Sequence, residues 1–354
     1  MEAWRRKIET IKRLEALLSP EERREALRDH HAKRPPRPCG ITIHTGIGCP
    51  LGCAYCYIYD MGFPGRVTPY PLSPLQMAFA IASNPHVAVG EWGSLVAVGS
   101  VTEPFLPETR DLALSYMEAI AKWLGNPIQV ATKMSPPLKL ADIQKGLDVL
   151  ISITDLSGRL EPRAPPPLER LRAGAELIRR GAHATLFVRP IVPGVTDREI
   201  ERLLITAREL GYRRVVFGTL RVTTGIVRRL RAFGVDVTPY VKRLDEKRQT
   251  PIRFPKEKFV AMARDLGFEV LPASCAANVA AHGQACVLCH WGPCGDVKKL
   301  KVEQREVEEY LEARGYKARV HVDDVIRVSI KLSKADKTFL EQATRLRVVE
   351  DKRR

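Results

Sequence analysis

Gly48-Cys-Pro-Leu-Gly-Cys-Ala-Tyr-Cys56 is a stretch in which three cysteines are separated by three and then two residues. Thiolates this close together can bind three corners of one iron–sulfur cluster, and the loop has no cysteine for the fourth corner. An iron without a protein ligand is open to an external one, which generally indicates chemistry rather than structure. Gly46, Gly48 and Gly52 allow the chain to turn tightly around the cluster. We therefore predict a catalytic cluster bound by Cys49, Cys53 and Cys56.

A closed zinc site is the alternative at this position. The three cysteines together with His44 could bind Zn²⁺ tetrahedrally. Structural zinc sites typically use two paired groups of ligands, whereas this loop offers a single dense group. The spacing therefore favours an iron–sulfur cluster.

Short β-branched runs alternate with helical patterns around and beyond the cysteine loop. We expect strands at 41–45, 95–99, 128–132, 149–154, 184–188 and 214–218. Helices are expected between them, at about 74–83, 108–124, 138–145, 166–180 and 197–210. This alternation predicts an α/β protein whose parallel sheet curls into a partial barrel. In such barrels the loops after the strands meet at one face. The cysteine loop and the polar residues that end the next three strands should therefore share one active site.

The rest of the chain divides into flanking segments. We expect N-terminal helices and a linker at 1–38, the barrel at 39–222, a cysteine-rich extension at 223–299 and a small basic α/β appendage at 300–354. The appendage should contain helices near 303–314 and 334–345 around a strand pair within 317–332. The sequence has no apolar run long enough for a membrane span, and a charged helix opens it, so we predict a cytoplasmic protein.

A second cysteine group, with ten, two and four residues between its members, consists of Cys275, Cys286, Cys289 and Cys294. Four thiolates can complete a coordination shell, so a second 4Fe-4S cluster and a structural zinc ion both fit. We favour the cluster because the first group already implies iron–sulfur loading, and disulfides do not suit a cytoplasmic protein. Cys39 stands alone and is interpreted as a buried structural thiol.

The first cysteine group resembles the signature of the radical S-adenosylmethionine (SAM) superfamily, in which an aromatic residue, here Tyr55, precedes the last cysteine. Within that superfamily the chain is similar to the spore photoproduct lyase-like branch, on the evidence of the stretches 45–57, 99–104, 152–155, 160–163 and 189–197. The resemblance covers about residues 39–220. It implies a partial (βα)6 TIM-like radical SAM barrel and a 4Fe-4S cluster whose open iron binds the amino and carboxylate groups of SAM. Reductive cleavage of SAM would give a 5′-deoxyadenosyl radical for hydrogen abstraction, with an electron donor such as ferredoxin or flavodoxin.

The resemblance also implies roles around SAM. Tyr55 would lie against the adenine, Ser100 and Glu103 would lie near the methionine end, and Lys133 would pair with the carboxylate. Ser152 and Arg189 would contact the ribose or the carboxylate. Each of these side chains has a structural alternative as a core residue, an ion-pair partner, a strand-end cap or a loop charge. A network between Glu161 and Arg163 would order the loop over the site, unless the two form only a surface ion pair.

The substrate is less defined than the cofactors. Spore photoproduct lyase relies on a cysteine between the cluster motif and the middle of the barrel, whereas this chain has none from 57 to 274. Only a cysteine of the second group could replace it, so photoproduct repair is not expected. The net charge of +16 favours DNA or RNA, although a basic proteome or a thermophile's charged surface also explains it. The appendage adds basic residues: Lys298, Lys299, Lys301, Arg319, Arg327, Lys331, Lys334 and Lys337.

Two further interpretations stay open. A peptide or small-molecule substrate would fit an auxiliary site at least as well as a nucleic acid. A zinc-binding nucleic-acid adaptor without catalysis, in which both cysteine groups are structural, is the alternative from a different class. It leaves the polar residues at the strand ends unexplained.

Overall fold

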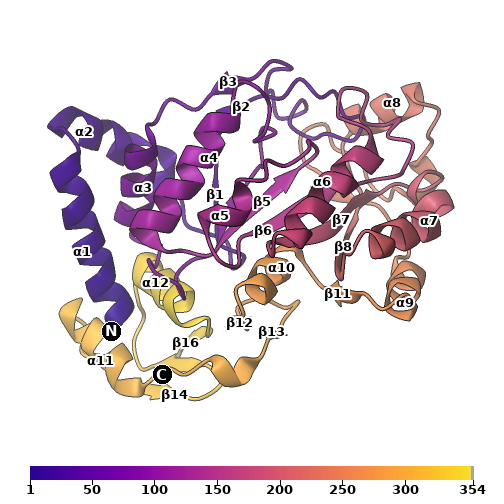
Figure 1. The fold of residues 1–354 in the computed structure, drawn as a ribbon. Coiled ribbons are helices and arrows are strands. Elements are labelled where there is room, and N and C mark those ends of the chain that lie inside the picture. The colour runs from indigo at the N-terminus through magenta and orange to yellow at the C-terminus, as the bar shows by residue number, and fades with distance from the viewer. Residues whose placement is uncertain (352–354) are drawn as a thin grey trace.

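The computed structural model describes residues 1–351 and is organised around one sheet of seven parallel strands. Neighbours in the sheet follow the order β1-β4-β5-β6-β7-β8-β11, and every neighbouring pair runs parallel (Figure 1). The strands are β1 (Ile41–Ile43), β4 (Val96–Val98), β5 (Ile128–Thr132), β6 (Asp148–Ser152), β7 (His183–Ile191), β8 (Arg214–Thr219) and β11 (Glu269–Leu271). The six expected strands are all present, and β11 extends the sheet by one.

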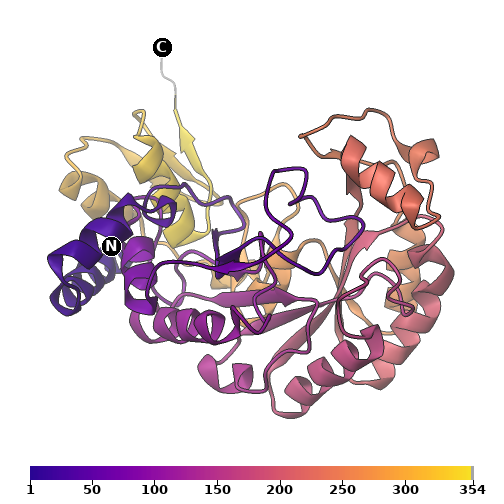
Figure 2. The ribbon, with the colours of Figure 1, turned by 90° about the horizontal axis from the view of Figure 1, so that it is seen from above.

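Helices connect successive strands and lie along the outer side of the curved sheet, while long loops lie on the opposite side (Figure 2). They are α3 (Pro74–Ser83), α4 (Arg110–Ala119, continued by a π turn at Ile120–Leu124), α5 (Leu140–Ile143), α6 (Pro167–Arg179), α7 (Thr196–Glu209) and α9 (Glu257–Asp265). The predicted α/β class and partial TIM-like barrel are thus confirmed.

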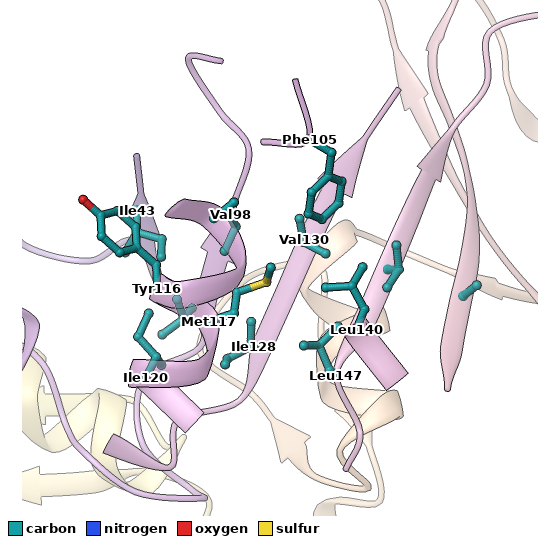
Figure 3. Packing of buried hydrophobic residues seen from close by; sticks show 14 of the residues in the cluster. Ile43, Val98, Phe105, Tyr116, Met117, Ile120, Ile128, Val130, Leu140 and Leu147 are labelled. Atoms are coloured by element: carbon teal, nitrogen blue, oxygen red, sulfur yellow. The ribbon is translucent and has the colours of Figure 1, made fainter. Parts of the chain in front are cut away.

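The first layer of helices is held by a dense apolar core. α3 begins with a capping box, in which Ser73 and Gln76 satisfy each other's backbone amides, and its residues from Gln76 to Ala82 are all buried. Tyr116 and Met117 of α4 pack toward the sheet residues Val98 and Val130 (Figure 3). This packing fixes the positions at which β1, β4 and β5 end.

A second helical element closes the inner side of the sheet. α10 (Ser274–Ala281) packs its alanines against Leu150, Phe187 and Val216 of the central strands. It is followed by two short paired strands, β12 (Ala285–Cys286) and β13 (Cys294–Gly295). The second cysteine group therefore lies beneath the barrel and not in a distant appendage.

The two ends of the described chain pack together. Helices α1 (Glu2–Leu17) and α2 (Pro20–Arg28) flank α3, and α1 also contacts the C-terminal segment (Figures 1 and 2). Trp4 lies edge-on to Tyr310 at 5.5 Å and to Phe339 at 5.6 Å, measured between ring centroids. The C-terminal elements are a 3₁₀ turn at Val297–Lys299, α11 (Gln304–Ala313), β14 (Val320–Val322), β15 (Ile326–Val328), α12 (Lys334–Thr344) and β16 (Val348–Glu350). Their boundaries as separate domains stay a prediction, because they share a core with α1. No helix in residues 1–351 is long and apolar enough to cross a bilayer.

Candidate active site

A cavity of about 450 Å³ is lined by the sheet, by the loops that follow its strands and by the start of α10. The loop after β1 supplies all three cysteines of the first group to its lining, and β1, β4, β5, β6, β7 and β8 each supply at least one residue. Each predicted cofactor residue lines this cavity: Tyr55, Ser100, Glu103, Lys133, Ser152 and Arg189. The expectation that these residues share one site agrees with this arrangement.

Hydrogen bonds from distant elements hold the cysteine loop. The Tyr59 hydroxyl donates to the carbonyl of Cys49 at 2.9 Å. Arg229, on helix α8 (Thr224–Ala232), donates to the carbonyl of Cys56 at 2.6 Å and pairs with Asp60 at 2.9 Å. These contacts fix both ends of the loop, so the thiols are positioned without a bound group.

Two glycines are required by the path of this loop. Gly48 has φ +85°, and a Cβ there would lie 2.1 Å from the carbonyl oxygen of Arg66. Gly52 has φ +68°, a conformation that side chains disfavour. The tight turns predicted from these two residues are present in the structure.

Burial raises the pKa of all three thiols of the first group, although the backbone amides of Leu51 and Glu103 lower that of Cys49. Binding of a metal would displace these protons. The loop brings three thiols into the cavity and holds no fourth cysteine, which suits a cluster with one open iron. His44 does not support the alternative of a zinc site with the three cysteines. It does not line the cavity and instead packs against His30, with ring centroids 4.9 Å apart.

Glu103 and Lys133 lie beside the cluster loop in a shared hydrogen-bond network. The Glu103 carboxylate accepts from the Thr132 hydroxyl at 2.5 Å and from the Lys133 backbone amide at 2.8 Å. Burial raises the pKa of Glu103 against the effect of these bonds. The Lys133 ammonium donates to the Ser152 hydroxyl at 3.2 Å and lies 5.5 Å from the centre of the Tyr55 ring. Burial lowers the pKa of Lys133, but Cys53, Glu161 and Glu103 raise it, and the net shift is upward.

A buried ion pair replaces the network expected between Glu161 and Arg163. Glu161 pairs with Arg170 of α6 at 2.6 Å, both side chains are almost completely buried, and Glu161 also accepts the Tyr55 hydroxyl. Arg163 instead donates to the carbonyl of Pro50 at 2.8 Å. The sequence expectation for this pair was wrong because Arg170, on an otherwise amphipathic helix, gives no sign in the sequence that it points inward.

Several buried polar atoms around the cavity have no partner within residues 1–351. They are Ser100 Oγ, Thr102 Oγ1 and Asn278 Oδ1. Buried polar atoms are nearly always hydrogen-bonded, so a group of unpartnered ones along one cavity indicates a polar ligand there.

Three arginines give the cavity a cationic side. Arg37, Arg189 and Arg221 line it, and within the described residues none forms an ion pair with a carboxylate. Burial and then the charge of Arg221, partly offset by Tyr57, lower the pKa of Arg189. Gly218 leaves room for the Arg189 side chain, since a Cβ there would lie 2.5 Å from the Arg189 Cδ. Arg37 and Arg221 were not among the predicted site residues, because isolated arginines in a basic sequence carry no distinguishing signal.

The second cysteine group reaches the same cavity through one of its members. Cys275 lines the cavity from α10, whereas Cys286 and Cys294 face each other across β12 and β13. Burial, and then the neighbouring thiols, raise the pKa of Cys275 to about 12 and that of Cys294 to about 11. Cys39 is exposed and also lines the cavity, so its interpretation as a buried structural thiol was wrong.

A buried arginine accompanies this second group. Arg345 is completely buried at φ +61°, contacts the Cys286 thiol and donates to the carbonyl of Gly93. Its Nε and Nη1 atoms have no partner in residues 1–351. Arg347, two residues further along the chain, donates to the carbonyls of Val287 at 3.2 Å and Cys289 at 3.3 Å. The turn after α12 thus contacts the second cysteine group and its loop through two guanidinium groups.

Comparison with known proteins was made by sequence and by structure. No protein-family model matches the chain. It is 28% identical over 203 residues to the radical SAM Nalpha-GlyT isomerase of Pseudomonas phage M6, covering 51% of this chain and 40% of the isomerase. It is 27% identical over 180 residues to uncharacterized protein ORF301 of Acidianus two-tailed virus, covering 45% of this chain and 58% of that protein. The chain thus spans about half the length of the curated relatives it matches.

Solved structures of spore photoproduct lyase variants share the fold. One superposes with a TM-score of 0.53 at 16% identity and covers 67% of this chain and 78% of the lyase. Another, with bound AdoMet and dinucleoside spore photoproduct, gives a TM-score of 0.50 at 16% identity, covering 65% and 75%. The sequence match to a radical SAM enzyme and this shared fold confirm the predicted resemblance to the radical SAM superfamily, in the fold of spore photoproduct lyase.

Proposed function

We propose that this protein is a radical SAM enzyme in which Cys49, Cys53 and Cys56 bind a 4Fe-4S cluster. The observation that carries the proposal is the single cavity that these three thiols share with the polar ends of four strands. When bound, the cluster and SAM would supply a 5′-deoxyadenosyl radical for hydrogen abstraction from the substrate. The protein's own task is to hold SAM, keep water away and position the substrate carbon.

The residues around the cavity suit SAM in charge and in hydrogen bonding. Lys133 supplies a buried cation for a carboxylate, and Ser100, which lines the same cavity, has an unpartnered hydroxyl. Glu103, fixed by two backbone amides and the Thr132 hydroxyl, is an acceptor for the amino group. Tyr55 offers an apolar ring whose hydroxyl is fixed by Glu161. Ser152 and Arg189 remain candidates for the ribose or the carboxylate.

We also propose that Cys275, Cys286, Cys289 and Cys294 bind a second metal centre. Arg345 supports this assignment, because a buried guanidinium without a carboxylate partner needs a negative neighbour. A metal centre bound by four thiolates carries a net negative charge. A 4Fe-4S cluster and a zinc ion would each provide that charge next to Arg345. Since Cys275 lines the cavity, this centre would face the substrate.

The substrate we propose is a nucleic acid or a nucleotide fragment. The cavity presents three arginines without acidic partners, which suits phosphate groups, and the chain carries a net charge of +16. The relative from phage M6 is named an isomerase of Nalpha-GlyT, and one structural neighbour binds a dinucleoside spore photoproduct. A peptide or small anionic substrate would use the same arginines.

The first experiment is anaerobic reconstitution with iron and sulfide, followed by iron, sulfide and zinc analysis and an assay for 5′-deoxyadenosine under strong reductant. We expect about four irons per chain for one cluster and about eight for two. Cys49→Ser should abolish 5′-deoxyadenosine formation, whereas His321→Gln, at an exposed position in the C-terminal segment outside both cysteine groups, should retain the iron. A folded protein that binds zinc, contains no iron and leaves SAM intact would favour the nucleic-acid adaptor instead.

The substrate class is tested separately with single-stranded and duplex oligonucleotides at increasing salt. We expect affinity to fall steeply with salt, and Arg221→Gln to weaken binding more than Arg319→Gln, which alters the appendage. Equal affinity for both variants, or no salt dependence, would exclude phosphate recognition by the cavity.

A further inference from the structure

Three histidines come together outside the cavity, where the N-terminal segment meets the first strand. His30 and His31 begin a 3₁₀ turn after α2, and His44 directly follows β1. One ring nitrogen from each lies within 4.8 Å of the other two. The ring centroids are 3.9 Å apart for His30 and His31 and 5.1 Å apart for His31 and His44. None of the proposed cofactor sites uses these side chains.

The hydrogen bonds around Asp29 fix the protons of two of the rings. One carboxylate oxygen accepts from His31 Nδ1 at 2.6 Å, and the other accepts from the Tyr70 hydroxyl at 2.6 Å. Because the Tyr70 proton is directed to Asp29, the Tyr70 oxygen accepts from His30 Nδ1 at 3.1 Å. Both imidazoles are thereby assigned as Nδ1–H tautomers, and each presents the lone pair of Nε2.

The Nε2 lone pair of His30 is unsatisfied, whereas that of His31 accepts one backbone N–H that a metal ion would have to replace. His30 Nε2 is buried and has no partner in the described part of the chain. His31, which is completely inaccessible to solvent, accepts at Nε2 only the backbone N–H of His44, at 3.2 Å. A buried acceptor without a donor is unfavourable, and a cation bound between the rings would satisfy it.

The charge state also suits a metal. Burial, and then the neighbouring His31, lower the pKa of His30 to about 4 and that of His44 to about 3. The rings are therefore neutral at physiological pH, which is the form that binds metals. A carboxylate that accepts from the other nitrogen of a ligating histidine is the usual support for such a site, and Asp29 has that relation to His31.

We propose that His30, His31 and His44 bind one divalent transition-metal ion of the class that imidazole favours, such as Zn²⁺, Co²⁺ or Ni²⁺. Tetrahedral bonds of about 2.0–2.1 Å place ligand nitrogens about 3.3 Å apart, so the three nitrogens, which lie within 4.8 Å of one another, would draw together on binding. A solvent molecule would complete the shell. The ion would link the N-terminal helices to the end of β1, a few residues before the cysteine loop, and so brace that loop from outside the cavity.

Cobalt titration of the reconstituted protein, with its cysteine groups already loaded, tests this proposal. Thiolate ligands give Co²⁺ intense near-ultraviolet charge-transfer bands, whereas imidazole ligands give only visible bands, so the two kinds of site are distinguishable. We expect one Co²⁺ per chain with visible bands alone, displaced by Zn²⁺. His30→Gln and His44→Gln should each weaken binding by more than about 100-fold, and Asp29→Asn by about 10- to 100-fold. His321→Gln, an exposed histidine in the appendage, is the matched control and should bind normally.

Thermal unfolding of the metal-free variants shows whether they are folded. His30 has a side chain that is 41% exposed, so its glutamine variant should unfold near the wild-type temperature. Failure of the wild type to bind Co²⁺ with visible bands, or unchanged affinity in folded His30→Gln and His44→Gln, would each overturn the proposal. Thiolate bands would instead report Co²⁺ at cysteines left unloaded, and the histidine variants would not remove those bands. None of these results depends on cleavage of SAM, so the proposed enzymatic function stands or falls separately.

Discussion

Replacement of Arg345 by methionine is expected to weaken metal binding by the second cysteine group by about 100- to 3,000-fold. Removing one partner of a buried charge pair costs about 3–5 kcal/mol, and each 1.4 kcal/mol is a factor of ten in affinity. Methionine keeps the aliphatic stem and the same backbone requirement at φ +61°, so the change removes mainly the charge. In the metal-free protein burial raises the pKa of the Cys286 thiol that Arg345 contacts, and Arg345 is a buried cation without a carboxylate partner in the described residues. There the same substitution should be neutral or stabilising.

The assay is competition between the protein and a chelator for the bound metal, combined with unfolding of the loaded and the metal-free forms. Arg347→Met is the matched control, because Arg347 is exposed and contacts only backbone carbonyls of the same loop. We expect it to change metal affinity by less than about tenfold, since such exposed contacts contribute about 1 kcal/mol or less. Equal losses in the two variants, or equal destabilisation of Arg345→Met with and without metal, would refute the assignment of Arg345 as a counter-ion.

Three further predictions concern the barrel. Glu161→Gln should lower the free energy of unfolding by about 3–5 kcal/mol by leaving Arg170 unpaired, as measured by chemical denaturation, and a loss below 1 kcal/mol would contradict the buried pair. Gly48→Ala should abolish iron retention, because its Cβ would lie 2.1 Å from a carbonyl oxygen, while Gly62→Ala, with open space around it, should keep more iron. Asp148 is protonated to about pH 6 when folded, because burial raises its pKa, and to about pH 4 when unfolded. The folded state therefore binds more protons between these values, and stability should fall by on the order of 2 kcal/mol as pH rises from 4 to 6, a slope that Asp148→Asn should remove.

The sequence predicted the sheet well and the partners of its polar residues poorly. All six expected strands are present. They were recognisable because parallel strands buried on both faces consist of continuous runs rich in β-branched residues. β11 was missed because it is only three residues long, and so short a stretch after a helix does not show whether it forms a strand or a loop. β16 was missed for the same reason.

The site shows the same division. Spacing along the chain identified the cysteine loop, and the rule that strand ends meet placed Glu103 and Lys133 beside it. The partner of Glu161 lies on α6 and that of Cys286 in the turn after α12, and both of these inward-facing arginines look like ordinary surface charges in sequence. Cys39 and the histidine group depend on how the N-terminal segment folds back on the barrel, which local pattern does not specify.

The contact of Trp4 with Tyr310 and Phe339 has a consequence for synthesis of the chain. Arg5 and its partner Glu309 are 304 positions apart, so at roughly 5–20 residues per second the ribosome needs about 15–60 s to supply the second half of this interface. During that time α1 can dock on α3, but the indole face of Trp4 stays in water. The nascent barrel therefore carries an unfinished apolar surface at its N-terminal side, and that surface is available to chaperones until the last helices emerge.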